Sequence, residues 1–158
     1  MRKILMAGAL LASLVTPSLA ADPGLYAGAR VDAAATALAN QQAPGGKGPS
    51  SVATTTDSFE KVMSHYKAAG TEMMMPRLPG QPDTGYEREL PSSTKPGAPG
   101  SGIKVKQVLI ILDGASDLAT SKNWVAVTRP FIMNMRIDGD RIVYEDVRDV
   151  TVIVQTKP

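Results

Sequence analysis

The chain of 158 residues contains no cysteine and only one histidine. The absence of cysteine excludes disulfides, thiolate metal sites, a cysteine nucleophile and a lipid anchor on cysteine. A single histidine excludes the zinc motifs that need two. We therefore expect the apolar core alone to stabilise the fold.

A strong charge of one sign is also missing. The whole chain has 17 basic and 15 acidic residues, but Arg2 and Lys3 belong to a leader-like N-terminus, and without them 15 basic residues face 15 acidic ones. No basic stripe interleaved with aromatic residues is present. We therefore expect no nucleic-acid binding and no attraction to anionic lipid through net charge.

The N-terminus has the three parts of a secretory signal. Arg2 and Lys3 precede the apolar run Ile4–Val15, which is too short to span a bilayer, and small residues lead up to Ala20. We expect a signal peptide over 1–20 and one mature domain over 21–158 in the periplasm or outside the cell. No later run is long and apolar enough for stable membrane insertion after cleavage.

The stretch Asp57–Gly70 predicts a helix with clear ends. Asp57 is a candidate N-cap with Glu60 in a capping-box position, and Gly70 is a candidate left-handed C-terminal cap. One apolar face follows the helical spacing i, i+3, i+4, i+7. Its members are Phe59, Val62, Met63 and Tyr66.

The rest of the N-terminal half is weaker in pattern. Val31–Gln42 predicts a second helix, and Ala43–Ser51 has the composition of a linker. Val52–Thr56 and Thr71–Met75 predict short strands on either side of the Asp57 helix. Residues 76–102 contain six prolines and five glycines, which predicts a disordered loop.

The C-terminal half predicts a run of antiparallel strands. Asp138-Gly139-Asp140 is a hairpin turn signal between two of them. The expected strands are Ile103–Leu112, Trp124–Thr128, Phe131–Ile137, Arg141–Tyr144 and Val147–Gln155. The predicted fold class is α+β, with one or two N-terminal helices packed on a mostly antiparallel sheet.

The run Val52–Lys67 (VATTTDSFEKVMSHYK) resembles a pattern in small exported bacterial proteins of unassigned role. In these a short strand ends in Thr-x-Asp-Ser, and the next helix carries V-x-x-[FY]-Y-[KR]. Asp113–Arg129 is similar to their later strand pair. Here His65 precedes Tyr66, where those proteins more often have an aromatic residue. The resemblance implies no catalytic residues.

Two catalytic patterns need weighing. Ser58-x-x-Lys61 at a helix start matches the nucleophile motif of penicillin-recognising enzymes, but its companion motifs are absent. His65 lies about 110° from the centre of the apolar stripe at 100° per residue, which predicts a position at the edge of the stripe or in solvent. A small hydrolase using Ser58 or His65 is thus an alternative. Helix capping by Asp57 and Ser58 explains the first pattern equally well, and a surface histidine without a site explains the second.

Two kinds of metal site also need weighing. Acidic residues cluster at Asp113/Asp117, Asp138/Asp140 and Glu145/Asp146/Asp149, but their spacing does not match a calcium loop. Methionines alternate on two predicted strands, and thioethers suit Cu(I). If those strands were neighbours, a Cu(I) site could form from Met73, Met75, Met133, Met135 and His65; core filling by methionine is the alternative.

The sequence therefore predicts an exported protein without catalytic, cofactor-binding or metal residues. We expect it to bind or modulate an envelope protein or a small ligand. A Met-based periplasmic Cu(I) carrier and a small hydrolase are the alternatives.

Overall fold

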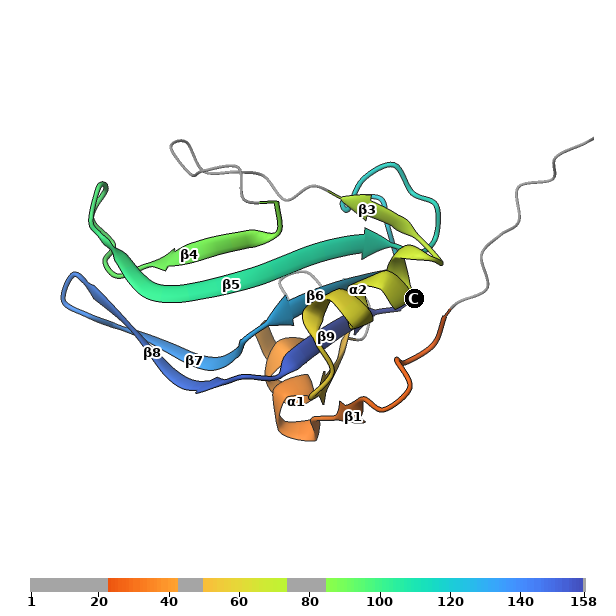
Figure 1. The fold of residues 1–158 in the computed structure, drawn as a ribbon, viewed down its shortest axis with the longest axis horizontal. Helices are drawn as coiled ribbons and strands as arrows, with labels where there is room; N and C mark the ends of the chain where they lie inside the picture. The colour runs from red at the N-terminus through yellow and green to blue at the C-terminus, as the bar shows by residue number, and fades with distance from the viewer. Residues whose placement is uncertain (1–22, 43–49, 74–84, 158) are drawn as a thin grey trace, which may run out of the picture.

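The structure, a computed structural model, describes residues 23–42, 50–73 and 85–157 (Figure 1). The helices in these ranges are α1 (Ala33–Gln42) and α2 (Phe59–Lys67). The strands are β1 (Arg30–Val31), β2 (Ser50–Thr55), β3 (Thr71–Met73), β4 (Glu87–Pro91), β5 (Gly100–Ile111), β6 (Trp124–Arg129), β7 (Phe131–Asp138), β8 (Arg141–Arg148) and β9 (Thr151–Thr156).

Seven of these strands form one antiparallel sheet. Its order is β1-β2-β9-β6-β5-β3, and β4 pairs with the first half of β5 along the edge that β3 occupies further on. β7 and β8 form a separate two-stranded sheet. The described chain is thus a mixture of helices and mostly antiparallel strands, which confirms the predicted class in its coarse form, and strands predominate in it.

Helix α2 contributes its apolar face to the main core. Phe59, Val62 and Tyr66 are buried, and they cluster with alternate residues of β5, β6 and β9, such as Val108 and Ile153. Met63 packs at the margin of this cluster. The predicted stripe is therefore the buried face of the helix.

The prediction that Asp57 caps α2 is wrong, whereas Ser58 does cap it. Ser58 is the N-cap, and its hydroxyl accepts a hydrogen bond from the Lys61 backbone N–H at 3.3 Å. The Asp57 carboxylate instead accepts bonds from the Tyr26 hydroxyl (2.8 Å) and the Lys61 ammonium (3.1 Å). Tyr26 belongs to the lead-in segment, the described residues 23–29 before β1, and lies 31 residues before Asp57. Asp57 thereby ties the lead-in segment to the start of α2.

Gly70 does not have the predicted left-handed conformation. The φ angle of Gly70 is not positive, and Ala68 ends the helix in a right-handed conformation. A Cβ at Gly70 would overlap the Ile111 carbonyl oxygen and lie 2.8 Å from Ile110 Cγ2. Glycine is required here because β5 approaches the chain closely.

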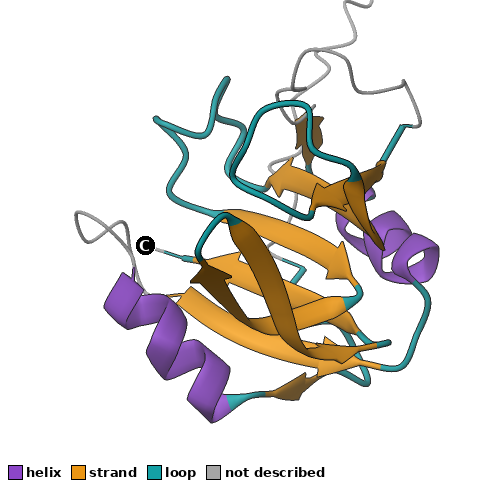
Figure 2. Ribbon diagram, turned by 90° about the vertical axis from the view of Figure 1, so that its left-hand side faces the viewer, coloured by secondary structure: helices purple, strands orange, loops and turns teal. Residues whose placement is uncertain are grey.

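Helix α1 lies on the other face of the sheet (Figure 2). Ala35 clusters with Val52, Phe131 and Val152, whereas Ile153, the next residue along β9, belongs to the α2 core. Successive strand residues point to opposite faces, so the two helices cover opposite sides.

The predicted helix over Val31–Gln42 starts too early. Val31 lies in β1 and is exposed, and Asp32 caps the helix by accepting from the Ala35 N–H at 2.9 Å. The Ala43–Ser51 linker falls on residues 43–49, outside the described ranges, and on Ser50 and Ser51, which begin β2.

The predicted disordered loop over 76–102 is wrong for its second half. Residues 87–91 form β4, and β5 begins at Gly100, so the two make a long hairpin. Glu89 stabilises the turn end of the hairpin by accepting from the Gly102 N–H at 2.7 Å. Residues 76–84 lie outside the described part of the chain.

The β4–β5 and β7–β8 hairpins project together from the main sheet (Figure 1). Their tips are joined: Ser93 bridges Arg141, and the Thr94 N–H donates to the Asp140 carbonyl at 2.9 Å. The Lys95 ammonium pairs with the Asp140 carboxylate at 2.5 Å. The hairpins therefore meet both at the sheet and at their ends.

Neither described helix has the length and hydropathy to span a membrane.

Candidate functional site

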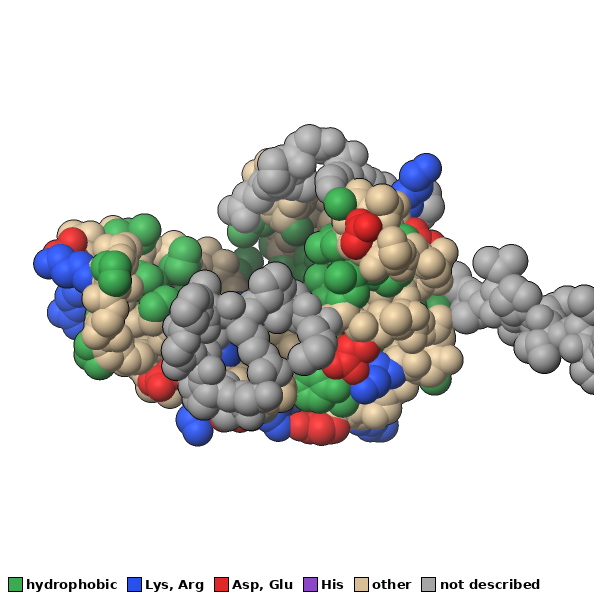
Figure 3. All heavy atoms as spheres, turned by 90° about the horizontal axis from the view of Figure 1, so that it is seen from above, with side chains coloured by type: hydrophobic (Ala, Val, Ile, Leu, Met, Phe, Trp, Pro, Cys, Tyr) green, Lys and Arg blue, Asp and Glu red, His purple; other side chains and the backbone are tan. Residues whose placement is uncertain are grey.

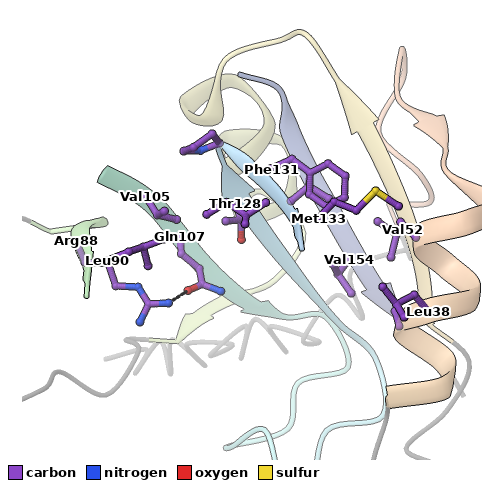
Figure 4. A pocket seen from close by; sticks show the side chains of 15 residues that line it. Leu38, Val52, Arg88, Leu90, Val105, Gln107, Thr128, Phe131, Met133 and Val154 are labelled. Atoms are coloured by element: carbon purple, nitrogen blue, oxygen red, sulfur yellow. Dashed lines mark hydrogen bonds between the residues drawn. The ribbon is translucent and has the colours of Figure 1, made fainter. Parts of the chain in front are cut away.

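A pocket of about 330 Å³ opens on the α1 side of the sheet, between the helix and the two hairpins (Figure 4). Its lining comes from α1, β2, β4, β5, β6, β7 and β9. This volume is at the lower end of the ~300–1,000 Å³ typical of small-molecule sites. We call it the α1 pocket.

One wall of the α1 pocket is apolar. Leu38 of α1, Val52 of β2 and Val154 of β9 lie beside Phe131 and Met133 of β7 in Figure 4. The alternation of β7 turns Phe131 and Met133 to the same face. Both residues pack in the α1-side cluster, so this wall is continuous with the core.

The opposite wall carries the polar groups. Arg88 pairs in register with Val105, and its guanidinium donates to the Gln107 side-chain oxygen at 3.0 Å. Glu87 and Glu89 alternate to the other face of β4, where the register sets them against Lys106 and Lys104. The pattern E-R-E-L thus turns Arg88 and Leu90 towards the pocket.

Among the described residues that line the pocket, Arg88 is the only one with a charged side chain. It has no carboxylate partner in the described ranges. Its positive charge reaches Tyr144 on β8, across the space between the hairpins. Burial raises the pKa of Tyr144, and the Arg88 charge acts in the opposite direction. A cation without an ion-pair partner among the described residues therefore lies at the rim of an apolar pocket.

The apolar wall extends along β7 beyond the pocket. Met135 and Ile137 follow Phe131 and Met133 on the same face, and each is 60% exposed. Tyr144, which pairs with Met135, donates its hydroxyl to the Pro91 carbonyl at 2.9 Å. This face is thus turned towards β4. Seen from above in Figure 3, the projecting part of the molecule carries apolar side chains beside lysine or arginine at its end.

The methionines predicted for Cu(I) do not converge. Met73 pairs with Leu109 on β3, at the far edge of the sheet, whereas Met133 and Met135 lie on the β7–β8 hairpin. His65 is on α2, which covers the face opposite to Met133. Met75 lies outside the described residues. The condition for that site, neighbouring strands, is not met by β3 and β7.

The Ser58-x-x-Lys61 pair is part of the helix start. The Ser58 hydroxyl caps α2 through the Lys61 backbone, while the Lys61 ammonium binds the Asp57 carboxylate. That ion pair raises the pKa of Lys61, first through the hydrogen bond to Asp57. A lysine held protonated in this way is a poor general base.

His65 is half-buried, which agrees with the predicted position at the edge of the apolar stripe. Its ring makes edge contacts with Tyr26 (5.2 Å between centroids) and Tyr66 (4.9 Å). Its Nε2 is out of contact with solvent and has no hydrogen-bond partner among the described residues. The histidine packs the lead-in segment against α2.

The predicted acidic clusters have structural partners. Asp117 caps its own turn by accepting from the Thr120 N–H at 2.9 Å, and Asp146 pairs with Arg148. Asp138 and Arg141 close the β7–β8 turn around Gly139, whose φ is +61°. Within the described ranges, no three histidine or acidic side chains group as metal ligands.

Asp113 organises the loop between β5 and β6. Its carboxylate accepts from the backbone N–H groups of Lys122 (2.6 Å), Asn123 (3.0 Å) and Ala115 (3.2 Å), and from the Ser121 hydroxyl (3.0 Å). Partial burial raises the pKa of Asp113, but these bonds together outweigh it and hold the pKa below its usual value.

We expect Asp113→Asn to lower the free energy of unfolding at pH 7 and to lower it progressively less towards pH 3. A carboxyl whose pKa is lower in the folded state stabilises the fold above its unfolded pKa of ~3.9, and loses this effect as the pH falls. Urea melts at pH 7, 5 and 3 measure the difference. Ser121→Ala should show the same trend more weakly, and a pH-independent difference would contradict the assignment.

Sequence reasoning missed the α1 pocket and Arg88. The pocket depends on pairing between β4 and β5, in a stretch whose proline and glycine content hides the strand. The alternation of Arg88 and Leu90 between Glu87 and Glu89 was the available signal.

We compared the chain with protein-family models, with curated proteins and with solved structures. None of the three comparisons found a match. The resemblance to small exported bacterial proteins accordingly stays a prediction, and the residues of the α1 pocket are the basis for any assignment of function.

Proposed function

We propose that the chain is an exported, non-catalytic binding protein, and that the α1 pocket receives the apolar part of a small ligand or of an envelope partner. The leader-like residues 1–20 support export to the periplasm or the cell exterior. The observation that carries the binding role is the preformed apolar pocket, whose walls come from seven elements.

The arrangement suits binding better than chemistry. Phe131, Met133 and Val154 present hydrocarbon and a thioether, and burying such groups against a ligand is favourable at about 25 cal/mol per Å². The polar side chains at the pocket, Arg88, Gln107 and Thr128, are a cation, an amide and a hydroxyl. These groups can orient a ligand by hydrogen bonds.

Filling the pocket should abolish uptake of an apolar probe. Leu38→Trp places a larger side chain in the pocket from the helix side, so we expect at least tenfold weaker binding of the neutral dye 1-N-phenylnaphthylamine. The measurement is the rise in dye fluorescence on titration with the mature protein. Each tenfold loss corresponds to ~1.4 kcal/mol.

Leu25→Trp is the matched control, because Leu25 is 39% exposed and lies outside the pocket. It should bind the dye as the unsubstituted protein does. Equal dye binding by the Leu38→Trp variant, with an unchanged melting temperature, would show that the dye binds elsewhere and would remove the proposal.

A further inference from the structure

The charge at the rim of the α1 pocket indicates the chemistry of its ligand. We propose that the pocket binds a single-chain fatty acid, with the hydrocarbon chain against β7 and the carboxylate at Arg88. This inference rests on the proposed binding function and adds the class of ligand to it.

The hydrocarbon part of the ligand matches the apolar wall. From Leu38 and Val154, the wall continues over Met133 to Met135 and Ile137, so it is elongated rather than round. Met135 and Ile137 are each 60% exposed, which is unusual for large apolar side chains on one strand face. An alkyl chain lying along β7 would cover them.

The carboxylate matches Arg88. Its guanidinium makes one hydrogen bond to Gln107, at 3.0 Å, and no ion pair within the described ranges. Arginine presents several donors in a planar fork that binds a carboxylate in two places. Glu87 and Glu89 alternate to the opposite face of β4, so the register keeps acidic side chains of this strand away from the anion.

The geometry also sets the order of the two parts. Arg88 and Gln107 stand on the β4–β5 hairpin, across the opening from Phe131 and Met133 (Figure 4). A carboxylate at Arg88 leaves the attached chain facing the apolar wall. The polar end of the ligand is then at the solvent side, where Arg88 is exposed.

Two matched probes test the inference: dodecanoate and 1-dodecanol, which carry the same chain and differ in the charge of the head. Calorimetric titration of the mature protein, below the concentration at which dodecanoate forms micelles, gives the Kd of each. We expect dodecanoate to bind at least tenfold more tightly. Decanoate, which is two methylenes shorter, should bind roughly fifteenfold more weakly than dodecanoate, since each buried methylene contributes about fourfold.

Arg88→Met should weaken dodecanoate about tenfold and leave 1-dodecanol unchanged, while Arg88→Lys should keep part of the preference. Lys104→Met is the matched control, because it removes the same charge from the outer face of the hairpin. It should leave both Kd values unchanged. The methyl NMR signal of Met133 should shift on binding, which locates the chain in the pocket.

The outcomes separate the two proposals. Equal affinity for both probes, with no effect of Arg88→Met, would overturn the fatty-acid assignment and leave the apolar pocket as a binding site. Binding of neither probe, together with failure of the dye titration, would overturn both. A Met133 signal that shifts with protein concentration, without any probe binding, would show a second copy in the pocket and would also overturn both.

Discussion

Replacing Phe59 by alanine should lower the free energy of unfolding by about 3–5 kcal/mol. Phe59 is 1% exposed at the first turn of α2, and its ring lies 5.8 Å from that of Tyr86. Its removal leaves a cavity between the helix and the sheet. Ring contacts with Tyr86 are lost as well, so the effect should approach the upper part of that range.

Urea melts of the two proteins, with the slope compared as well as the midpoint, measure this loss. Phe59→Leu should cost less, because it keeps most of the buried hydrocarbon. Met135→Ala is the control on an exposed apolar residue and should change stability by less than ~0.5 kcal/mol. A loss below ~1 kcal/mol for Phe59→Ala would show that the α2 face is not buried in solution.

Replacing Gly70 by alanine should cost about 2–3 kcal/mol, although it adds one methyl group. The added Cβ would overlap the Ile111 carbonyl oxygen, which belongs to the backbone of β5 and cannot turn aside as a side-chain end would. It would also lie 2.8 Å from Ile110 Cγ2 and 2.9 Å from Leu112 Cδ2. The turn after α2 must then move away from the sheet.

Gly114→Ala separates this overlap from a backbone effect. Gly114 has a φ of +73° and open space around the position of a Cβ, so alanine there should cost about 1–2 kcal/mol through conformation alone. Thermal or urea unfolding of the two variants gives the comparison. Equal losses, or a smaller loss for Gly70→Ala, would contradict the close approach.

The sequence predicted the elements whose cause is local. The Phe59 stripe and the alternating strands of the C-terminal half follow from side-chain periodicity. The apolar sides of α2, β5, β6 and β9 are then buried in the core. The cap errors are also local: Ser58 and Asp57 are both good N-caps, and Asp57 is instead engaged by Tyr26. No spacing rule could supply a partner 31 residues away.

The parts that sequence reasoning missed depend on long-range pairing. β4 is short, proline-containing and mostly polar, and it is a strand because β5 offers it a partner. Val31 has a helical spacing with Ala34 and Ala35, but it lies in β1 and pairs with Ala53 of β2. The α1 pocket needs all of these pairings at once, so its residues could not be assembled from local pattern.

The place of β9 in the sheet has a consequence for how the chain folds. β9 is the last of the described strands, yet it lies between β2 and β6 and pairs with β2 residues about a hundred positions earlier. Until Thr151–Thr156 is available, β2 has no neighbour towards the centre of the sheet, and the α1 side cannot close. Contacts of such sequence separation make folding slow. A chain synthesised from its N-terminus therefore completes this sheet only after β9 has emerged.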